Sequence, residues 1–167
     1  MSTCALTRRA AICAMGALAL SPAVALAQGP VRFRNVEVDV GPLRASTGDP
    51  TAAWVAETLP GQLAQALGPY LAPGNRAGAT LIARIDYLYL GPTSGGTGPA
   101  GSSQDTIAGL LIVRGPRGSI AEETPLRAIT SYYTNAVDQA LIVRTNYYRV
   151  AALAQAFAYW VPRQLRL

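Results

Sequence analysis

The amino terminus of the chain limits which residues can take part in the fold. Residues 1–27 have the parts of an export signal in order: two arginines, a short apolar run, and small residues before a cleavage point between Ala27 and Gln28. Cleavage there leaves 140 of the 167 residues and removes both cysteines. The rest has the size of one domain and must hold together by packing, because it can form no disulfide. We therefore predict a signal peptide over 1–27 and a single periplasmic domain over 28–167.

An uncleaved membrane anchor is the alternative interpretation of the same segment. Residues 10–27 carry no charge over 18 positions, but Pro22 and the alanine-rich composition disfavour a spanning helix. Such a helix needs about 20 strongly apolar residues. Cys4 and Cys13 lie too early in the segment to serve as the lipid-bearing cysteine of a lipoprotein. We expect no transmembrane span in the mature chain of this Gram-negative-type bacterial protein.

The residue types that the chain lacks exclude several chemistries. It contains no histidine and no lysine, so nucleophile pairs with histidine, zinc sites, Schiff bases and lysine-containing phosphate loops cannot be built. The mature chain keeps 12 arginines against 9 acidic residues, a net charge of +3 without an arginine run. That small excess argues against nucleic acid as a partner. We expect no catalytic residue, no metal site and no cofactor.

Hydrophobic periodicity predicts four strands and two helices. The strands are expected over 31–40, 79–90, 106–114 and 119–133, and the helices from Pro50 onward and over the C-terminal segment around 150–161. An earlier helical stretch over 136–143 is either continuous with the last helix or separated from it near Thr145. A bulge is expected near Asn35, a hairpin turn over 115–118 and irregular pairing around 123–125.

Each predicted helix carries an apolar stripe. Residues four apart form the first stripe, and steps of three and four form the second: Val55, Leu59, Leu63, Leu67 and Leu71, then Val150, Leu153, Phe157, Trp160 and Val161. Asp49 and Pro50 predict the N-cap and first position of the first helix, and residues 41–48 before them are expected to be a loop. Pro60 predicts a kink or two short helices.

The segment over 79–90 reads as a central strand, since both of its faces are partly apolar. Strict alternation places Tyr87 and Tyr89 on the face of Leu81 and Ile85. The glycine-rich segment over 91–101 is expected to be a flexible loop. The order strand, helix, strand, strand, strand, helix predicts an α+β two-layer sandwich, with a four-stranded, mainly antiparallel sheet and two amphipathic helices on one face.

Several segments in this order also carry a resemblance to a known group of proteins. They are residues 59–63, 81–85, 113–118, 125–127, 131–133, 137–138 and 153–157. In these the chain resembles small exported envelope proteins typified by the LPS-assembly lipoprotein (LptE-like) and the auxiliary lipoproteins of envelope ABC-transport systems. The resemblance implies an envelope protein that works by binding. Those families are lipid-anchored, whereas this chain lacks the lipid-bearing cysteine, and no binding residue carries over.

Two pairs of adjacent tyrosines are candidate binding residues: Tyr132 with Tyr133, and Tyr147 with Tyr148. Adjacent tyrosines cannot both face one core, so some are expected at a rim, where ring and hydroxyl suit a protein or sugar surface. The alternative is packing at a helix–sheet boundary with the hydroxyls in water.

Charged residues on the strands give a weaker candidate. Arg84 and Asp86 share a strand face, with Arg114 expected across from them, and could form an anion site or a carboxylate with a shifted pKa. The alternative is a solvated salt bridge. Asp105 is expected to cap a turn. Glu122 and Glu123 are expected to point to opposite faces of a strand, so they are poor candidates for the carboxylate pair of a hydrolase.

These observations predict an exported, non-enzymatic envelope protein that binds a protein or an envelope component. A carrier of a small lipid or hydrophobic ligand, held between the helices and the sheet, is the alternative. A carboxylate- or tyrosine-based hydrolase is a third hypothesis, since those side chains remain available.

Overall fold

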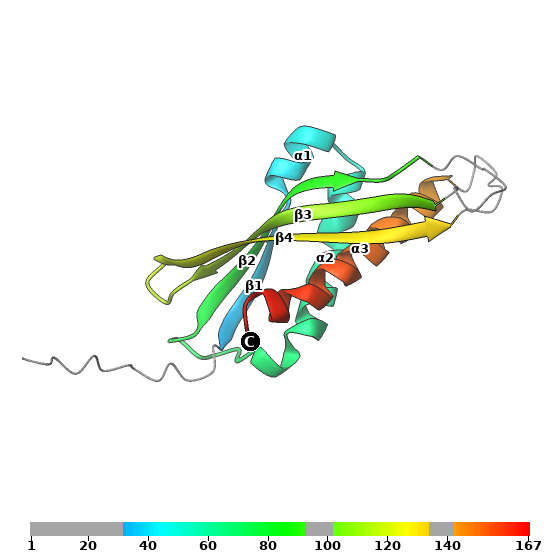
Figure 1. Ribbon diagram of the computed structural model, residues 1–167. Coiled ribbons are helices and arrows are strands. Elements are labelled where there is room, and N and C mark those ends of the chain that lie inside the picture. Colours follow the sequence, from blue (N-terminus) through cyan, green and yellow to red (C-terminus); the bar gives the residue numbers. More distant parts are fainter. Residues whose placement is uncertain (1–31, 93–101, 134–141) are drawn as a thin grey trace, which may run out of the picture.

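A computed structural model describes residues 32–92, 102–133 and 142–167 (Figure 1). The predicted signal peptide with its Ala27–Gln28 cleavage point lies outside this range, as do residues 93–101 and 134–141. The elements are β1 (Phe33–Asp39), α1 (Gly41–Thr47), α2 (Thr51–Ala66), the 3₁₀ helix η1 (Gly68–Tyr70), β2 (Ala79–Tyr89), β3 (Ser102–Arg114), β4 (Ile120–Tyr133) and α3 (Ile142–Gln164).

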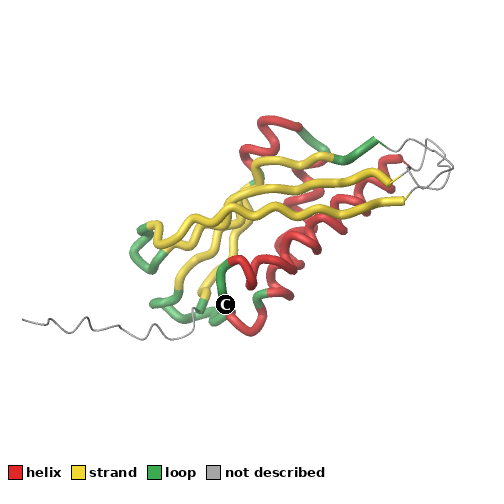
Figure 2. Tube along the Cα trace, viewed as in Figure 1, coloured by secondary structure: helices red, strands yellow, loops and turns green. Residues whose placement is uncertain are grey.

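The four strands form one sheet in the order β1-β2-β3-β4. The β2–β3 and β3–β4 pairs are antiparallel, while β1 and β2 are parallel because α1 and α2 return the chain between them. Helices α2 and α3 lie side by side on one face of the sheet (Figures 1 and 2). The predicted α+β class with a mainly antiparallel four-stranded sheet is confirmed.

The core lies between the helices and the sheet. Side chains of both stripes are fully buried: Val55, Leu59 and Leu63 on α2, Leu67 directly after its end, and Val150, Leu153, Phe157 and Val161 on α3. They pack against Leu81, Ile85, Ile107 and Leu111 of the central strands. Trp160, expected in the second stripe, is instead 41% exposed. Helical spacing predicts that Trp160 belongs to the buried face of α3, but this position lies at the exposed border of that face.

Strand β2 changes faces at Asp86, which corrects the expected position of two tyrosines. The β2–β3 pairing shifts between Ile85 and Tyr87, so Leu88 is buried while Tyr87 and Tyr89 are about half exposed. Gly109 lies opposite Ile85, where a Cβ atom would stand 2.1 Å from the Arg84 carbonyl oxygen. The bulge therefore needs a glycine on the neighbouring strand. It places both tyrosines on the sheet face that the helices leave uncovered.

The segment between β1 and α2 differs from the expected loop. Residues 41–47 form α1, which begins where the Gly41 amide donates to Asp39 Oδ1 (2.8 Å) and which buries Leu43 completely. A seven-residue helix with one buried side chain gives no periodic signal in the sequence.

Helix α2 begins at Thr51, one residue later than predicted, and no side chain caps its first turn. The expected Asp49 N-cap is wrong, and this carboxylate instead pairs with Arg44 at 3.3 Å. Pro60 lies within a single helix rather than between two short ones.

The other local predictions have mixed outcomes. The β1–β2 register shifts between Phe33 and Asn35, which confirms the bulge. The turn over 115–118 is confirmed, with Gly118 at φ +83°. Irregular pairing was expected around 123–125, but the described β3–β4 pairing is regular at these residues. The register of this strand pair shifts between Val113 and Arg114 instead.

Candidate functional site

The solvent-facing side of α3 carries two groups of aromatic and arginine side chains. Tyr148, Gln155, Tyr159 and Arg163 are all exposed and follow each other at steps of four and seven residues, which places them on one side of a helix. We call Trp54, Arg144, Tyr147 and Tyr148 the first aromatic cluster. We call Tyr159, Trp160 and Arg163 the second aromatic cluster.

The rings of the first aromatic cluster hold each other in fixed orientations. Trp54 of α2 meets Tyr147 edge-on at a centroid distance of 6.1 Å, and Tyr147 meets Tyr148 in the same way at 5.9 Å. The Arg144 guanidinium lies 5.7 Å from the centre of the Tyr148 ring, and its Nε donates to the Tyr148 hydroxyl at 3.3 Å. Tyr148 remains 55% exposed. Edge-to-face and cation–π contacts thus orient an exposed aromatic surface.

Tyr147 links α3 to α2 by a hydrogen bond. Its hydroxyl donates to Oε1 of Glu57 on α2 at 3.2 Å. Partial burial raises the pKa of Tyr147 above its ordinary value, and the hydrogen bond to Glu57 with the negative charge of that carboxylate raises this pKa further. The phenol therefore stays protonated and acts as a donor, not as a base.

The second aromatic cluster lies near the other end of α3. Tyr159 and Trp160 meet edge-on at 5.5 Å, and the Arg163 guanidinium lies 5.3 Å from the centre of the Trp160 ring. Tyr159 is 72% exposed, the largest value among the exposed large hydrophobic side chains of the described residues. Both ends of the helix surface therefore combine aromatic rings with a guanidinium.

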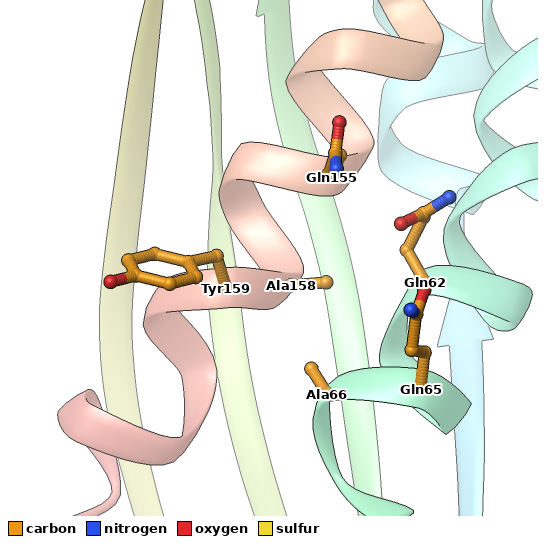
Figure 3. A pocket seen from close by; sticks show the side chains of 6 residues that line it. All are labelled: Gln62, Gln65, Ala66, Gln155, Ala158 and Tyr159. Atoms are coloured by element: carbon orange, nitrogen blue, oxygen red, sulfur yellow. The ribbon is translucent and has the colours of Figure 1, made fainter.

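A shallow hollow of about 240 Å³ lies between α2 and α3 and extends to Tyr159 of the second aromatic cluster. It is lined by Gln62, Gln65 and Ala66 of α2 and by Gln155, Ala158 and Tyr159 of α3 (Figure 3). The two glutamines of α2 lie opposite Ala158, whereas the ring of Tyr159 points away from α2. Three amides can donate and accept hydrogen bonds, so the hollow suits polar groups of a partner.

The four predicted tyrosines fall into two groups. Tyr147 is partly buried and Tyr148 is exposed, both in the first aromatic cluster. Tyr132 and Tyr133 end strand β4, opposite Ser103 and Ser102, and their side chains lie outside the described part of the structure. A binding role for these residues remains a prediction.

The charged residues of β2 form a salt bridge. Arg84 Nε donates to Asp86 Oδ1 at 2.9 Å, and both side chains are about two-fifths exposed. The hydrogen bond and the negative charge of Asp86 raise the pKa of Arg84. Arg114, expected across from this pair, instead lies opposite Thr80, while Arg84 lies opposite Leu110. The expected three-residue group is therefore not formed.

A buried ion pair that the sequence analysis missed lies beneath the first aromatic cluster. Asp105 of β3 is fully buried and Arg149 of α3 is 3% exposed. Arg149 Nε donates to Asp105 Oδ2 at 2.8 Å, and its Nη2 donates to Asp105 Oδ1. Gly91 closes the network: its amide donates to Asp105 Oδ1 (3.0 Å), and its carbonyl oxygen accepts from Arg149 Nη2 (2.7 Å).

This network corrects the prediction that Asp105 caps a turn. A signal was available, because Asp105 is two residues before Ile107 on the buried side of β3 and Arg149 is four residues before Leu153 on the buried side of α3. A charge on each of two apolar faces indicates a buried pair. The pair fixes the start of α3, and with it Tyr147 and Tyr148, against the sheet.

The described residues offer neither a metal-binding cluster nor a membrane-spanning helix. They contain no group of three or more aspartate, glutamate, histidine or cysteine side chains that could hold a metal ion. None of their helices has the length and apolar character needed to span a bilayer.

Comparison with known proteins gives a likeness of fold. No protein-family model matches the chain, and no curated protein matches it. A putative lipoprotein from Caulobacter crescentus has a similar structure at 14% sequence identity, with a TM-score of 0.51 over 78% of this chain and 86% of that chain. At this identity the likeness shows a shared fold.

Two other solved structures have lower scores. A minor lipoprotein from Acinetobacter baumannii is 13% identical, with a TM-score of 0.46 over 81% of this chain and 92% of that one. The rare lipoprotein B from Shewanella oneidensis is also 13% identical, with a TM-score of 0.44 over 79% of this chain and 93% of that one.

Proposed function

We propose that the protein is an exported, non-enzymatic component of the cell envelope that binds a protein or another envelope component through the outer side of its helices. The observation that carries this proposal is the pair of exposed aromatic–arginine clusters on one helix surface. The lipoprotein neighbours and the predicted export signal support the location.

The composition of the two clusters favours binding. Tyrosine, tryptophan and arginine are the side chains most enriched at the energetically important points of protein interfaces. Here their neighbours already restrict their rotamers, so less conformational entropy is lost when a partner binds. The amides of Gln62, Gln65 and Gln155 add hydrogen-bonding groups in the hollow that extends to Tyr159.

A pull-down from a crosslinked envelope fraction tests the proposal. The unaltered protein should recover a reproducible partner, and Tyr148→Ala and Tyr159→Ala should each reduce the recovery at least several-fold. Ile120→Ala is the matched control, because it removes an exposed apolar side chain (55% exposed) from β4 near the hairpin. Circular dichroism verifies that each variant is folded. Repeated recovery of the protein alone would contradict the proposal.

The location has its own test. Intact-mass measurement of the protein from a periplasmic extract should give a chain that begins at Gln28. Molecules that remain in the cytosol and begin at Met1 would contradict export.

A further inference from the structure

The outer edge of β1 already accepts a short stretch of extended chain. Among the described strands, β1 pairs only with β2, so its other edge faces away from the sheet. Phe33 and Leu71 form an isolated parallel bridge there, and the Ala72 amide donates to the Phe33 carbonyl oxygen at 2.8 Å. The chain then turns away. Residues 35–39 continue this edge, and the first position shows that parallel pairing fits. The Val36 amide of this segment donates to Asn35 Oδ1 at 2.9 Å, a local contact that an added strand would replace.

Two hollows lie along this edge and share Arg34 and Asn35. The first, of about 230 Å³, is largely apolar and is also lined by Val36, Pro60, Ala64, Leu71 and Pro73. The second, of about 410 Å³, is also lined by Gly74, Asn75 and Arg76. The apolar hollow, the cationic hollow and the edge of β1 adjoin one another. One ligand can therefore contact all three.

The groups around the second hollow are mostly donors. Arg34 Nε donates to Thr80 Oγ1 at 3.1 Å, which holds this side chain, and its other nitrogens have no hydrogen-bond partner among the described residues. Asn75 Oδ1 accepts from the Ala77 amide at 3.1 Å, which leaves the amide nitrogen of Asn75 as its free end. Arg76 is exposed and forms no ion pair within the described part of the chain. Two guanidiniums and an amide nitrogen select an anionic group.

One acidic side chain, Glu37, lies near this hollow without lining it, so the two arginines of the lining outnumber its charge. Glu37 Oε1 accepts from Asn35 Nδ2 at 2.9 Å, beside and not within the set of lining residues. Residues 28–32, which precede β1, contain no acidic side chain. The chain's own amino-terminal segment therefore cannot supply the complementary charge.

We propose that the free edge of β1 binds an extended segment of a partner protein as an added strand beside residues 35–39. An apolar side chain of that segment occupies the first hollow, and an acidic side chain occupies the second, between Arg34 and Arg76. Main-chain hydrogen bonds to an edge strand supply affinity in this mode, and pockets for particular side chains supply specificity. The site shares no residue with either aromatic cluster.

Fluorescence anisotropy with the purified protein and a labelled nine-residue peptide tests this inference. The peptide alternates valine with threonine and carries one glutamate. We expect Arg34→Gln and Arg76→Gln each to weaken its binding about tenfold, the usual effect of losing a charge-assisted hydrogen bond. Arg117→Gln, the matched control in the hairpin turn, removes the same charge elsewhere and should change the affinity less than twofold.

Three further probes distinguish the proposed contacts from others. A peptide with lysine in place of glutamate and a backbone N-methylated peptide should both bind at least tenfold more weakly. The glutamate peptide should also slow hydrogen exchange of the amides of residues 35–39. Equal binding of the lysine peptide, no binding of the glutamate peptide, or an equal effect of Arg117→Gln would overturn the proposal. Binding of phosphatidylglycerol vesicles that depends on Arg34 and Arg76, without peptide binding, would overturn it in favour of a lipid headgroup.

Discussion

At the level of single residues, the buried pair of Asp105 and Arg149 supports the first aromatic cluster of the proposed binding surface. Their bidentate contact lies in the core, between β3 and the first turns of α3. A buried charge without its partner is costly, because the low-dielectric interior cannot replace the lost solvation. The residues just before Arg149 are Tyr147 and Tyr148, so a loss of this pair would also release the aromatic rings.

Asp105→Ala should therefore lower the free energy of unfolding by about 3–5 kcal/mol. Urea denaturation followed by circular dichroism measures this. The exposed Arg44–Asp49 pair is the control, since its side chains are 51% and 57% exposed. Asp49→Ala should cost less than about 1 kcal/mol. Equal losses of unfolding free energy for the two substitutions would contradict a larger contribution of the buried ion pair to stability.

The raised pKa of Tyr147 predicts a distinct step in a tyrosine titration. The difference between the absorbance titrations of the unaltered protein and Tyr147→Phe should give a pKa above 10.0, the ordinary value. Because the folded-state pKa is the higher one, the linked stabilisation is complete below the ordinary tyrosine pKa and is lost as the pH rises through the raised value. A difference titration centred at or below 10.0 would contradict the partial burial of Tyr147 together with its contact with Glu57.

Among the elements, helix α2 and strand β3 show how the same residue type can have opposite roles. Gly61 follows Pro60 inside α2, where an added Cβ atom would meet no other atom within 4 Å. Gly109 in β3 lies against the bulge of β2, where an added Cβ atom would overlap the Arg84 carbonyl oxygen at 2.1 Å. The first glycine costs backbone entropy without a packing reason, whereas the second is required by close approach.

Substitution of these glycines by alanine should therefore have opposite signs. Gly61→Ala should raise the free energy of unfolding by about 0.5–1 kcal/mol. Gly109→Ala should lower it by about 1–3 kcal/mol, because the backbone of β2 must move. Thermal unfolding of both variants measures the two effects. A loss of stability for Gly61→Ala, or no loss for Gly109→Ala, would contradict the packing described for these elements.

Periodicity was sufficient to predict the elements that have a long buried side. Both helical stripes and all four strands follow from spacing, since residues such as Leu59 and Phe157 recur at the helical period. It failed where one residue changes the phase. The bulge at Asp86 adds one residue to β2 and so moves Tyr87 and Tyr89 to the other face of the sheet. The alternation of apolar and polar residues does not indicate where a strand bulges.

The candidate sites were predictable only in part, because most of them depend on contacts between distant segments. Adjacent tyrosines pointed to Tyr147 and Tyr148, but Trp54 joins them from another helix. Asp105 and Arg149 are 44 residues apart. The sequence indicates that each charge lies on an apolar face, and the fold determines that the two meet.

For the whole molecule, the two proposed sites lie on different parts of the fold. The aromatic clusters occupy the outer side of the helices, and the edge of β1 lies at the margin of the sheet (Figure 1). A protein of this kind could contact two partners, or two regions of one partner, at the same time. The carrier and hydrolase hypotheses stay predictions from the sequence.

Site-specific photo-crosslinking in intact cells tests most directly whether the protein binds a partner through its helices. A photoreactive phenylalanine derivative is placed at Tyr148 and, as the control, at Ile120. We predict a crosslinked product of one defined mass from position 148 that is absent from position 120. No product from position 148, or the same products from both positions, would contradict the proposed function.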